Sequence, residues 1–238
     1  MGLADPHCHT SASDGMVGPR ELVAAAVAAG LDLIAVTDHD TMASVREAVR
    51  RGEEMGIEVV AGEEVTTAWP GQTHVLGWFL KTPVRSGRGL EYTIDAIHDQ
   101  GALAVIPHPF MPTYFASCQP AMLRRLISTR RLDGIELVHT SPLTARRRRA
   151  LEAFYEANRE RLGARLAGSD SHFGGHDLGR VRVEYPGRTA ADFREAVLER
   201  RTTPGPGARP HPAPAAMRAR QQFRSLVELP WRRLRGGL

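Results

Sequence analysis

Two histidines near the start of the chain, His7 and His9, are the residues whose type and spacing point most directly to chemistry. Side chains of an extended strand alternate between its two faces, so these imidazoles share one side and can bind the same metal ion. The same alternation turns the intervening Cys8 away, and we do not expect a thiolate ligand. One such pair is weak evidence by itself, since His-x-His also occurs on protein surfaces.

More side chains of ligand-forming types recur in short clusters along the chain. They are Asp14, Asp38, His39, Glu63, Glu64, His74, His108, Asp170 and His172. The chain has 10 histidines, and six of them belong to these clusters or to the first pair. Mixed imidazole and carboxylate ligation suits Mn²⁺, Fe²⁺ or Zn²⁺ better than Mg²⁺. The residue pattern therefore predicts metal chemistry.

Short apolar runs alternate with helical patterns down to about residue 202, and these elements must position the clusters. Strands are predicted at 3–6, 31–37, 57–62, 73–79, 103–107, 134–138, 165–168 and 180–184. Helices are predicted at 21–29, 42–55, 90–99, 120–130, 144–162 and 190–200. This alternation predicts an α/β protein with a parallel sheet, and seven or eight units fit a closed barrel. A doubly wound open sheet alternates in the same way, but no Gly-x-Gly-x-x-Gly turn follows the first predicted strand.

Five of the groups fall at or just past the carboxyl ends of predicted strands: His7 with His9, Asp38 with His39, Glu64, His108, and Asp170 with His172. In a closed barrel these ends converge on one mouth, where active sites are found. Ligand candidates far apart in the sequence would become neighbours there. Without a metal, so many ionisable groups would repel one another and remain poorly solvated.

Length and composition permit either one large barrel or two small domains, with 238 residues of which 42% are hydrophobic. No apolar stretch approaches the roughly 18 residues that cross a bilayer, and the N-terminus lacks the pattern of a signal peptide. The two cysteines, Cys8 and Cys118, make no disulfide framework. We therefore expect a cytoplasmic protein.

The chain changes character after residue 202, so we expect a barrel over 1–202 and a tail over 203–238. The tail begins with a Pro-rich linker and holds seven Arg and one Glu, a charge of +6 against −2 for the residues before it. Residues 217–238 can form a basic amphipathic helix. Such a helix could dock on the barrel, contact an anionic membrane or bind nucleic acid.

With these residues the chain resembles the polymerase and histidinol phosphatase (PHP) family of metal-dependent phosphoesterases. The matching strings are DPHCHTSASDG at 5–15, VTDHDT at 36–41, GEEVTT at 62–67, HVLG at 74–77, PHPF at 107–110 and GSDSH at 168–172. They occur in the family order over about residues 1–185. The resemblance implies a distorted (β/α)7 barrel of the PHP type, followed here by the Pro/Arg-rich C-terminal tail.

The resemblance also implies two to three divalent metal ions, Mn, Fe or Zn, with nine protein ligands in the full set. By position the ligands are His7, His9, Glu64 and Asp170 for a first ion, Glu64 with His74 and His108 for a second, and Asp14, His39 and His172 for a third. The Gly-x-Glu pattern favours Glu64 over Glu63, and only one of two neighbouring side chains in a strand can face the site.

The implied activity is metal-dependent hydrolysis of a phosphoric ester, by a phosphatase or a phosphodiesterase. Divalent cations neutralise the anionic ester and lower the pKa of a bridging water. We expect in-line attack by this metal-bridging hydroxide on a small phosphorylated metabolite or nucleotide, without a covalent phosphoenzyme. Asp38 would support a metal-bound histidine from behind.

The residues expected to act in catalysis are Asp38, His39, His172 and His139. His139 closes a predicted strand and could contact substrate or donate a proton. The substrate phosphate could meet His176 or Arg180 on the Gly-rich loop after residue 172, or Arg20 near the first cluster. The arginines at 146–149 span a full helical turn, which favours a solvated helix face over contact with nucleic acid.

Substrate and class of function stay open on these grounds. Relatives that act on nucleoside 3′,5′-bisphosphates or short RNA usually carry a helical lid between the equivalents of His74 and His108, where this chain has only 33 residues. Histidinol phosphate is a second substrate option. The alternative to an enzyme is a metal-stabilised barrel that binds nucleic acid or a membrane through its Arg-rich tail. Removal of residues 203–238 would separate these functions.

Overall fold

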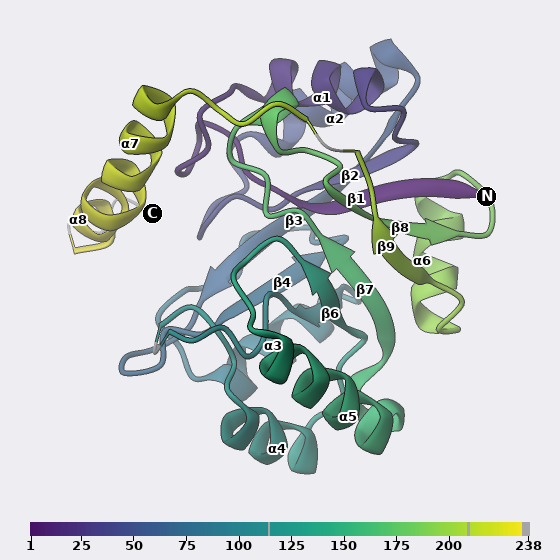
Figure 1. Cartoon of the computed structure of the whole chain (residues 1–238), viewed down its shortest axis with the longest axis vertical. Helices are drawn as coiled ribbons and strands as arrows, with labels where there is room; N and C mark the ends of the chain where they lie inside the picture. Colours follow the sequence, from purple (N-terminus) through teal and green to yellow (C-terminus); the bar gives the residue numbers. More distant parts are fainter. Residues whose placement is uncertain (114, 209, 235–238) are drawn as a thin grey trace.

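One sheet of nine strands, curled into a nearly closed barrel, organises the part of the chain that the structure describes (Figure 1). This computed structural model describes residues 1–113, 115–208 and 210–234. The strands are β1 (Gly2–Cys8), β2 (Leu33–Val36), β3 (Glu58–Thr66), β4 (His74–Trp78), β5 (Leu103–Ile106), β6 (Gly134–His139), β7 (Ala164–Gly168), β8 (Val181–Tyr185) and β9 (Thr203–Pro206). Their order across the sheet is β7-β6-β5-β4-β3-β2-β1-β8-β9. Each predicted strand overlaps one of them.

The barrel closes where β1 meets the segment that follows β7. The backbone N–H of His9 donates to the carbonyl oxygen of Ser171 at 2.8 Å, and the N–H of Ser171 donates to the carbonyl oxygen of His7 at 3.2 Å. Cys8 and Ser171 thereby form a parallel bridge. Residues 7–9 and 168–172 consequently share one mouth of the barrel.

The sheet is not wholly parallel, which corrects the expectation from the sequence. β4 runs antiparallel to both β3 and β5, β8 runs antiparallel to β1, and β9 runs antiparallel to β8. Only residues 67–73 connect β3 to β4. A parallel connection needs about a dozen residues or more, so this short loop permits only an antiparallel pair. The strand–helix alternation is interrupted there, and the count of seven strand–helix units is not confirmed.

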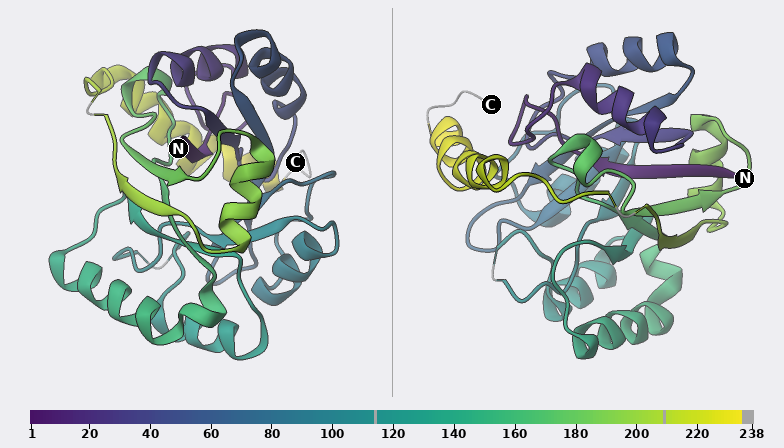
Figure 2. Two further views of the ribbon diagram at one scale, coloured as in Figure 1. Left: turned by 90° about the vertical axis from the view of Figure 1, so that its right-hand side faces the viewer. Right: turned by 45° about the horizontal axis from the view of Figure 1, so that its top comes forward.

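Helices cover the barrel on two sides (Figure 2). α1 (Pro19–Ala28) and α2 (Val45–Met55) lie beside β1–β3, whereas α3 (Leu90–His98), α4 (Pro120–Thr129) and α5 (Ala145–Leu162) lie beside β4–β7, and α6 (Ala190–Leu198) packs near β8. Two of these helices have end residues of the usual capping types. Gly56, with φ 71°, ends α2 in the left-handed conformation. The Thr144 hydroxyl accepts the N–H of Arg147 at the start of α5.

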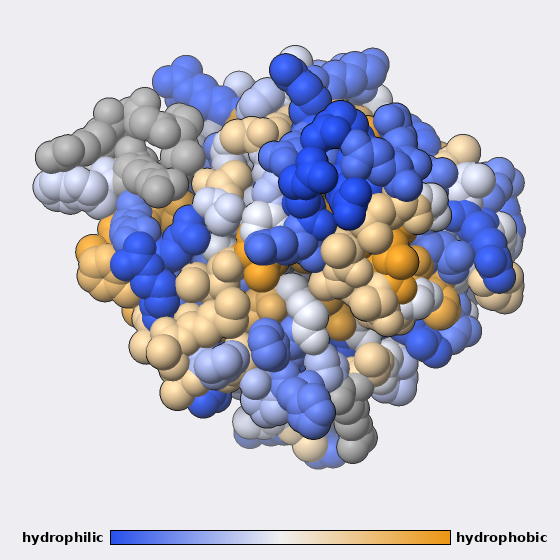
Figure 3. Space-filling model, turned by 90° about the horizontal axis from the view of Figure 1, so that it is seen from above, coloured by the Kyte–Doolittle hydropathy of each residue, from blue (hydrophilic) through white to orange (hydrophobic). Residues whose placement is uncertain are grey.

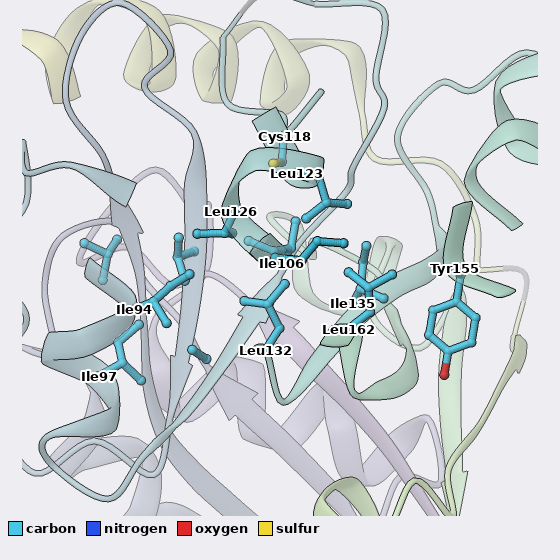
Figure 4. Packing of buried hydrophobic residues seen from close by; sticks show 14 of the residues in the cluster. Ile94, Ile97, Ile106, Cys118, Leu123, Leu126, Leu132, Ile135, Tyr155 and Leu162 are labelled. Carbon is cyan, nitrogen blue, oxygen red and sulfur yellow. The ribbon is translucent and has the colours of Figure 1, made fainter. Parts of the chain in front are cut away.

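A buried apolar cluster attaches α3, α4 and α5 to the barrel (Figure 4). Ile94 of α3, Leu126 of α4 and Leu162 of α5 meet Ile106 and Ile135 from the strands. Each of these side chains is at most 1% exposed. Burial of a side chain of this size contributes about 1.5–3 kcal/mol. The cluster therefore fixes the strands whose ends form the mouth.

The face seen from above, over α1 and α2, mixes hydrophilic and hydrophobic side chains (Figure 3). On α2, Glu54 pairs with Arg50 at 2.6 Å and with Arg51 at 3.0 Å. Pairs at these helical spacings are typical of a solvated helix surface. This layer covers the barrel and faces solvent.

The tail does not stay apart from the barrel. Part of the stretch expected to be a linker forms β9, which pairs antiparallel with β8. The chain then crosses the molecule and forms α7 (Ala215–Phe223), a short π-helical segment η2 (Arg224–Glu228) and α8 (Leu229–Leu234), at the side away from the N-terminus (Figures 1 and 2). No helix within the described ranges is long and apolar enough to span a membrane.

Candidate metal centre

Six imidazoles and three carboxylates converge at the mouth where the barrel closes. They come from the strand ends at this mouth and from the loops that follow them: His7, His9, Asp14, His39, Glu64, His74, His108, Asp170 and His172. Antiparallel β4 contributes its first residue, His74, because its start lies beside the end of β3. All nine predicted ligand residues belong to this one cluster.

Glu64 lies at the centre of the cluster. Its Oε2 atom is 3.2 Å from Nε2 of His7 and 3.1 Å from Nε2 of His9. Its Oε1 atom is 2.8 Å from Nδ1 of His74 and 3.0 Å from Nε2 of His108. Oε2 also lies 3.3 Å from Nδ1 of His39. The pair His7 and His9 thus faces one oxygen and the pair His74 and His108 faces the other, which is the arrangement that a bridging ligand needs.

Three groups of side chains present ligand atoms within 4.8 Å of one another. They are His7 with His9, Glu64 and Asp170; His9 with Asp14, His39 and His172; and His39 with Glu64 and His74. The first group has the same members as the ligand set expected for the first ion. The second contains the three residues expected around another ion, with Nε2 of His172 3.1 Å from Oδ1 of Asp14.

Several ring nitrogens of the cluster suit metal ligation better than hydrogen bonding. Nε2 of His9, Nδ1 of His39 and Nδ1 of His74 are buried and make no hydrogen bond, although oxygens of Glu64 lie 2.8–3.3 Å away. A buried polar atom without a partner is unfavourable and rare. A divalent cation accepts both imidazole nitrogen and carboxylate oxygen and would satisfy these atoms. The residues present therefore fit divalent metal ions.

Two residues of the cluster have unusual backbone conformations. His108 has φ 29° and Asp170 has φ 54°, and such left-handed conformations cost about 1–3 kcal/mol in residues other than glycine and concentrate at functional sites. Gly168 has a different role, because it allows the Glu136 carboxylate to lie close to the backbone. A Cβ at this position would lie 1.9 Å from Oε1 of Glu136. The glycine leaves the space through which Glu136 reaches His7.

Glu136, a fully buried residue in β6, is the carboxylate that orients a histidine of the cluster. Its Oε1 atom lies 2.9 Å from Nδ1 of His7, and its Oε2 atom accepts the backbone N–H of His108 at 2.7 Å. This contact holds Nδ1–H toward Glu136 and leaves Nε2 facing the cluster. The sequence analysis missed Glu136, although a glutamate inside an otherwise apolar strand is a signal that could have revealed it.

Asp38 does not take the predicted place behind a histidine. It accepts the N–H and the hydroxyl of Thr10, both at 2.7 Å, the hydroxyl of Ser13 at 2.6 Å and the hydroxyl of Ser44. No histidine is among its hydrogen-bond partners in the described chain. Asp38 points away from the neighbouring His39, as alternation along an extended segment requires, and it orders the loop 10–14 that carries Asp14.

Electrostatics separates the two neighbouring glutamates of β3. Burial acts to raise the pKa of Glu64, but the surrounding imidazoles, His74 first, outweigh it and hold that pKa well below its usual value. Burial raises the pKa of Glu63 to about 8, although its carboxylate accepts the N–H of Val84 at 2.7 Å. Only the carboxylate on the imidazole side is kept ionised, which supports Glu64 over Glu63 as the residue that faces the site.

The structure does not bring the other predicted residues into the cluster. His139 ends β6, is 6% exposed, and has both ring nitrogens unpaired, and burial lowers its pKa to about 4. Nδ1 of His176 lies 3.2 Å from the carbonyl oxygen of His211. Arg180 and Arg20 are exposed. None of these four candidates lines the cavity over the cluster.

Arg147 departs from the solvated helix face expected for 146–149. Its guanidinium donates to the carbonyl oxygens of Phe110 at 2.8 Å and Met111 at 3.3 Å. These residues lie in the loop that begins with His108. Arg147 therefore fastens α5 to the loop that carries a predicted ligand.

A cavity of about 210 Å³ lies over the cluster, and the tail closes one side of it. The barrel contributes Glu64 to the lining, and the tail contributes Gln221 and Ser225. Nε2 of Gln221 donates to Oδ2 of Asp14 at 3.1 Å. The sequence analysis named docking on the barrel as one option for the tail, but a single glutamine in a basic segment gives no signal of such a contact.

Comparison with known proteins agrees with this site. A family model described as the PHP domain matches residues 5–176, a range that contains all nine clustered residues. An uncharacterized protein of Methanocaldococcus jannaschii is 33% identical over 145 residues, which cover 56% of this chain and 80% of that protein. A 5′-3′ exoribonuclease of Haemophilus influenzae is 46% identical over 74 residues, which cover 31% of this chain and 27% of the exoribonuclease.

Solved structures share the fold. A two-domain protein of Bacteroides vulgatus, described as containing a predicted PHP-like metal-dependent phosphoesterase, superposes with a TM-score of 0.69 at 22% identity. The superposition covers 87% of this chain and 65% of the other. The chain thus spans about a quarter of the exoribonuclease and less than two thirds of this solved protein.

Proposed function

We propose that this chain, which belongs to the PHP domain family, hydrolyses phosphoric esters with divalent metal ions held by the strand-end cluster. The observation that carries the proposal is the convergence of three carboxylates and six imidazoles, several with unpaired ring nitrogens, on one cavity. Bound Mn²⁺, Fe²⁺ or Zn²⁺ would neutralise the ester and lower the pKa of a water for in-line attack. The similarity to an exoribonuclease supports this class of reaction.

We assign two to three ions to the cluster. The ligands are His7, His9, Glu64 and Asp170 for the first, Glu64, His74 and His108 for the second, and Asp14, His39 and His172 for the third. The distances around Glu64 support its role as the bridge. Its position between the two imidazole pairs would hold the first two ions close together.

The protein's own groups keep these ligands in place and contact the substrate. Glu136 holds the ring of His7, and Asp177 accepts the N–H of His172 at 2.7 Å. His39 and His172 line the cavity, where they can contact the phosphoryl group or pass a proton to the leaving oxygen. Contacts of His139, His176, Arg180 and Arg20 with substrate stay predictions.

The substrate that we propose is a small phosphorylated metabolite or nucleotide. The cavity of about 210 Å³ is smaller than the roughly 300–1,000 Å³ of ordinary ligand pockets. It has room for a phosphoryl group and the atoms next to it. The remainder of the substrate would extend beyond it.

Hydrolysis assays on the Mn²⁺-reconstituted protein test the proposal. The panel contains mononucleotides, nucleoside 3′,5′-bisphosphates, short oligonucleotides and histidinol phosphate. We expect metal-dependent turnover that disappears in Asp170→Asn and persists in Asp99→Asn, a matched change at an exposed aspartate. A fully active Asp170→Asn variant would contradict the ligand assignment, and no turnover on any ester would contradict the function.

A further inference from the structure

We propose that residues 221–230 of the tail form a selective wall of the substrate site, which admits esters with a small leaving group and excludes a continuous nucleic-acid strand. The inference rests on the proposed function and names the substrate class that its site accepts. Its basis is the side-chain contacts that fix this segment to the cluster and to the loop after β1. Figures 1 and 2 show the course of the tail along the side of the barrel.

Arg224 fastens the segment to the loop after β1. Its guanidinium donates to the carbonyl oxygens of Ser11 at 2.8 Å, Ser13 at 2.7 Å and Gly15 at 2.7 Å. The Arg224 side chain is only 13% exposed. Because the three acceptors surround Asp14 in sequence, this arginine ties the segment to the loop that holds a predicted metal ligand.

Gln221 brings the tail into direct contact with the cluster. Its amide donates to Oδ2 of Asp14, whereas Oδ1 of the same carboxylate faces His172 at 3.1 Å. Gln221 is 9% exposed although it belongs to a polar helix at the surface. The segment therefore lies against the metal side of the cavity and leaves little room between them.

A second cavity, of about 250 Å³, continues from the first and shows where the leaving group would lie. Both cavities are lined by His39, His74 and Ser225. The tail adds Leu226, Leu229 and Pro230 to the lining of the second cavity, and Phe115 lines it as well, so these residues give it an apolar wall. A phosphoryl group over the cluster would thus direct its leaving group into a narrow space with an apolar wall.

The charges of the segment do not form a track for a nucleic-acid backbone. Arg224 is used by the loop carbonyls, and Glu228 of the segment pairs at 3.1 Å with Arg220, the residue just before the segment. Proteins that hold a continuous single strand present an open positively charged groove with stacking aromatics. Here the segment covers the side through which the strand would have to leave, so the site favours a phosphate at the end of a small molecule.

Binding to the Mn²⁺-loaded full chain tests the wall without turnover. The probes are phenylphosphonate, as a small ester analogue, and a phosphorothioate decathymidylate without terminal phosphates, as a continuous strand. We expect the wild type to prefer phenylphosphonate, and Arg224→Ala and Leu226→Ala each to reduce this preference about tenfold. Arg218→Ala, which removes the same charge from an exposed position of α7, should leave the preference unchanged.

The direction of the effect makes the test sharp, because Arg224→Ala removes a positive charge and yet should strengthen binding of the polyanion. Mn²⁺ titration of each variant shows whether the Asp14 loop still binds metal. Leu226 is 71% exposed and therefore provides a variant that does not threaten the fold.

Each outcome has one meaning. Equal preference in Arg224→Ala, Leu226→Ala and Arg218→Ala would overturn the wall, as would a wild type that binds the strand as tightly as phenylphosphonate. Selective phenylphosphonate binding that the two wall variants relax, together with no hydrolysis of any ester, would support the wall and overturn the proposed catalytic function. No phenylphosphonate binding at all would overturn both.

Discussion

The two walls of the site are built in different ways. The barrel wall consists of ligand side chains at strand ends, and Glu64, His7 and His9 among them are fully buried. The tail wall reaches the cluster through Gln221 and is fastened to the loop after β1 by Arg224. The first wall is part of the folded core and the second is added to it by side-chain contacts. We infer that the barrel wall determines the chemistry and the tail wall determines what reaches it.

Among the changes to the barrel wall, removal of the central carboxylate should reduce activity most. Glu64→Gln keeps the shape of the side chain but removes the charge that faces five imidazoles. Because metal ions supply several kcal/mol of charge stabilisation, we expect a loss of about 1,000-fold or more in kcat/KM. Glu53→Gln at an exposed position of α2 is the matched control and should keep wild-type activity. Steady-state hydrolysis of the best ester of the panel measures both.

Loss of the Glu136 carboxylate, which orients the predicted ligand His7, should reduce metal affinity or activity by a smaller factor. Glu136→Gln retains a group that can accept from Nδ1 of His7 but removes its charge. We expect metal affinity or activity to fall about 10–100-fold, as for other groups that orient metal-bound histidines. Mn²⁺ titration measures the change, and an affinity equal to that of the wild type would show that Glu136 does not support the centre.

Arg147→Ala tests how the loop with His108 is fastened to the barrel wall. Loss of hydrogen bonds from the guanidinium to Phe110 and Met111 should lower the free energy of unfolding by about 1.5 kcal/mol. The exposed neighbour Arg149, changed to Ala, should stay within about 0.5 kcal/mol of the wild type. Denaturant unfolding compares the two, and equal stabilities would restore the solvated-face interpretation for both arginines.

The smallest expected effect is the pH dependence of stability from a hydrogen bond far from both walls. The hydrogen bond from Nε2 of His98 to Asp133, 2.8 Å long, raises the pKa of that imidazole. The bond therefore contributes its full stability below the ordinary histidine pKa of about 6.5. That contribution is lost as the pH rises through the raised value. The difference in unfolding free energy between wild type and His98→Asn should shrink from pH 5.5 to pH 8.5, and a constant difference would contradict the assignment.

The sequence was most informative for the barrel wall. Apolar runs that alternate with helical patterns located the strands, and ligand-type residues at their ends predicted which side chains meet. This succeeds because closure of a barrel places strand ends together whatever their separation in sequence. The prediction of a wholly parallel sheet failed at β4, because the length of the connecting loop decided the direction of the strand. The loop 67–73 is short and makes β4 antiparallel.

The second wall was beyond sequence reasoning for a physical reason. Arg224 and Gln221 act through contacts with residues more than 200 positions away, and neither periodicity nor a motif encodes such a pairing. The roles of Asp38 and Arg147 depend likewise on which way a side chain points after the backbone is placed. Glu136 differs from these, because its charge within an apolar strand was visible.

The number of metal ions per chain tests the central claim most directly. Elemental analysis of the 238-residue chain, purified and reconstituted with Mn²⁺, Fe²⁺ or Zn²⁺, should find two to three ions per chain, and fewer in Glu64→Gln. Circular dichroism confirms that both proteins are folded. A folded wild type that retains no metal ion after reconstitution would contradict a metal centre at the strand ends.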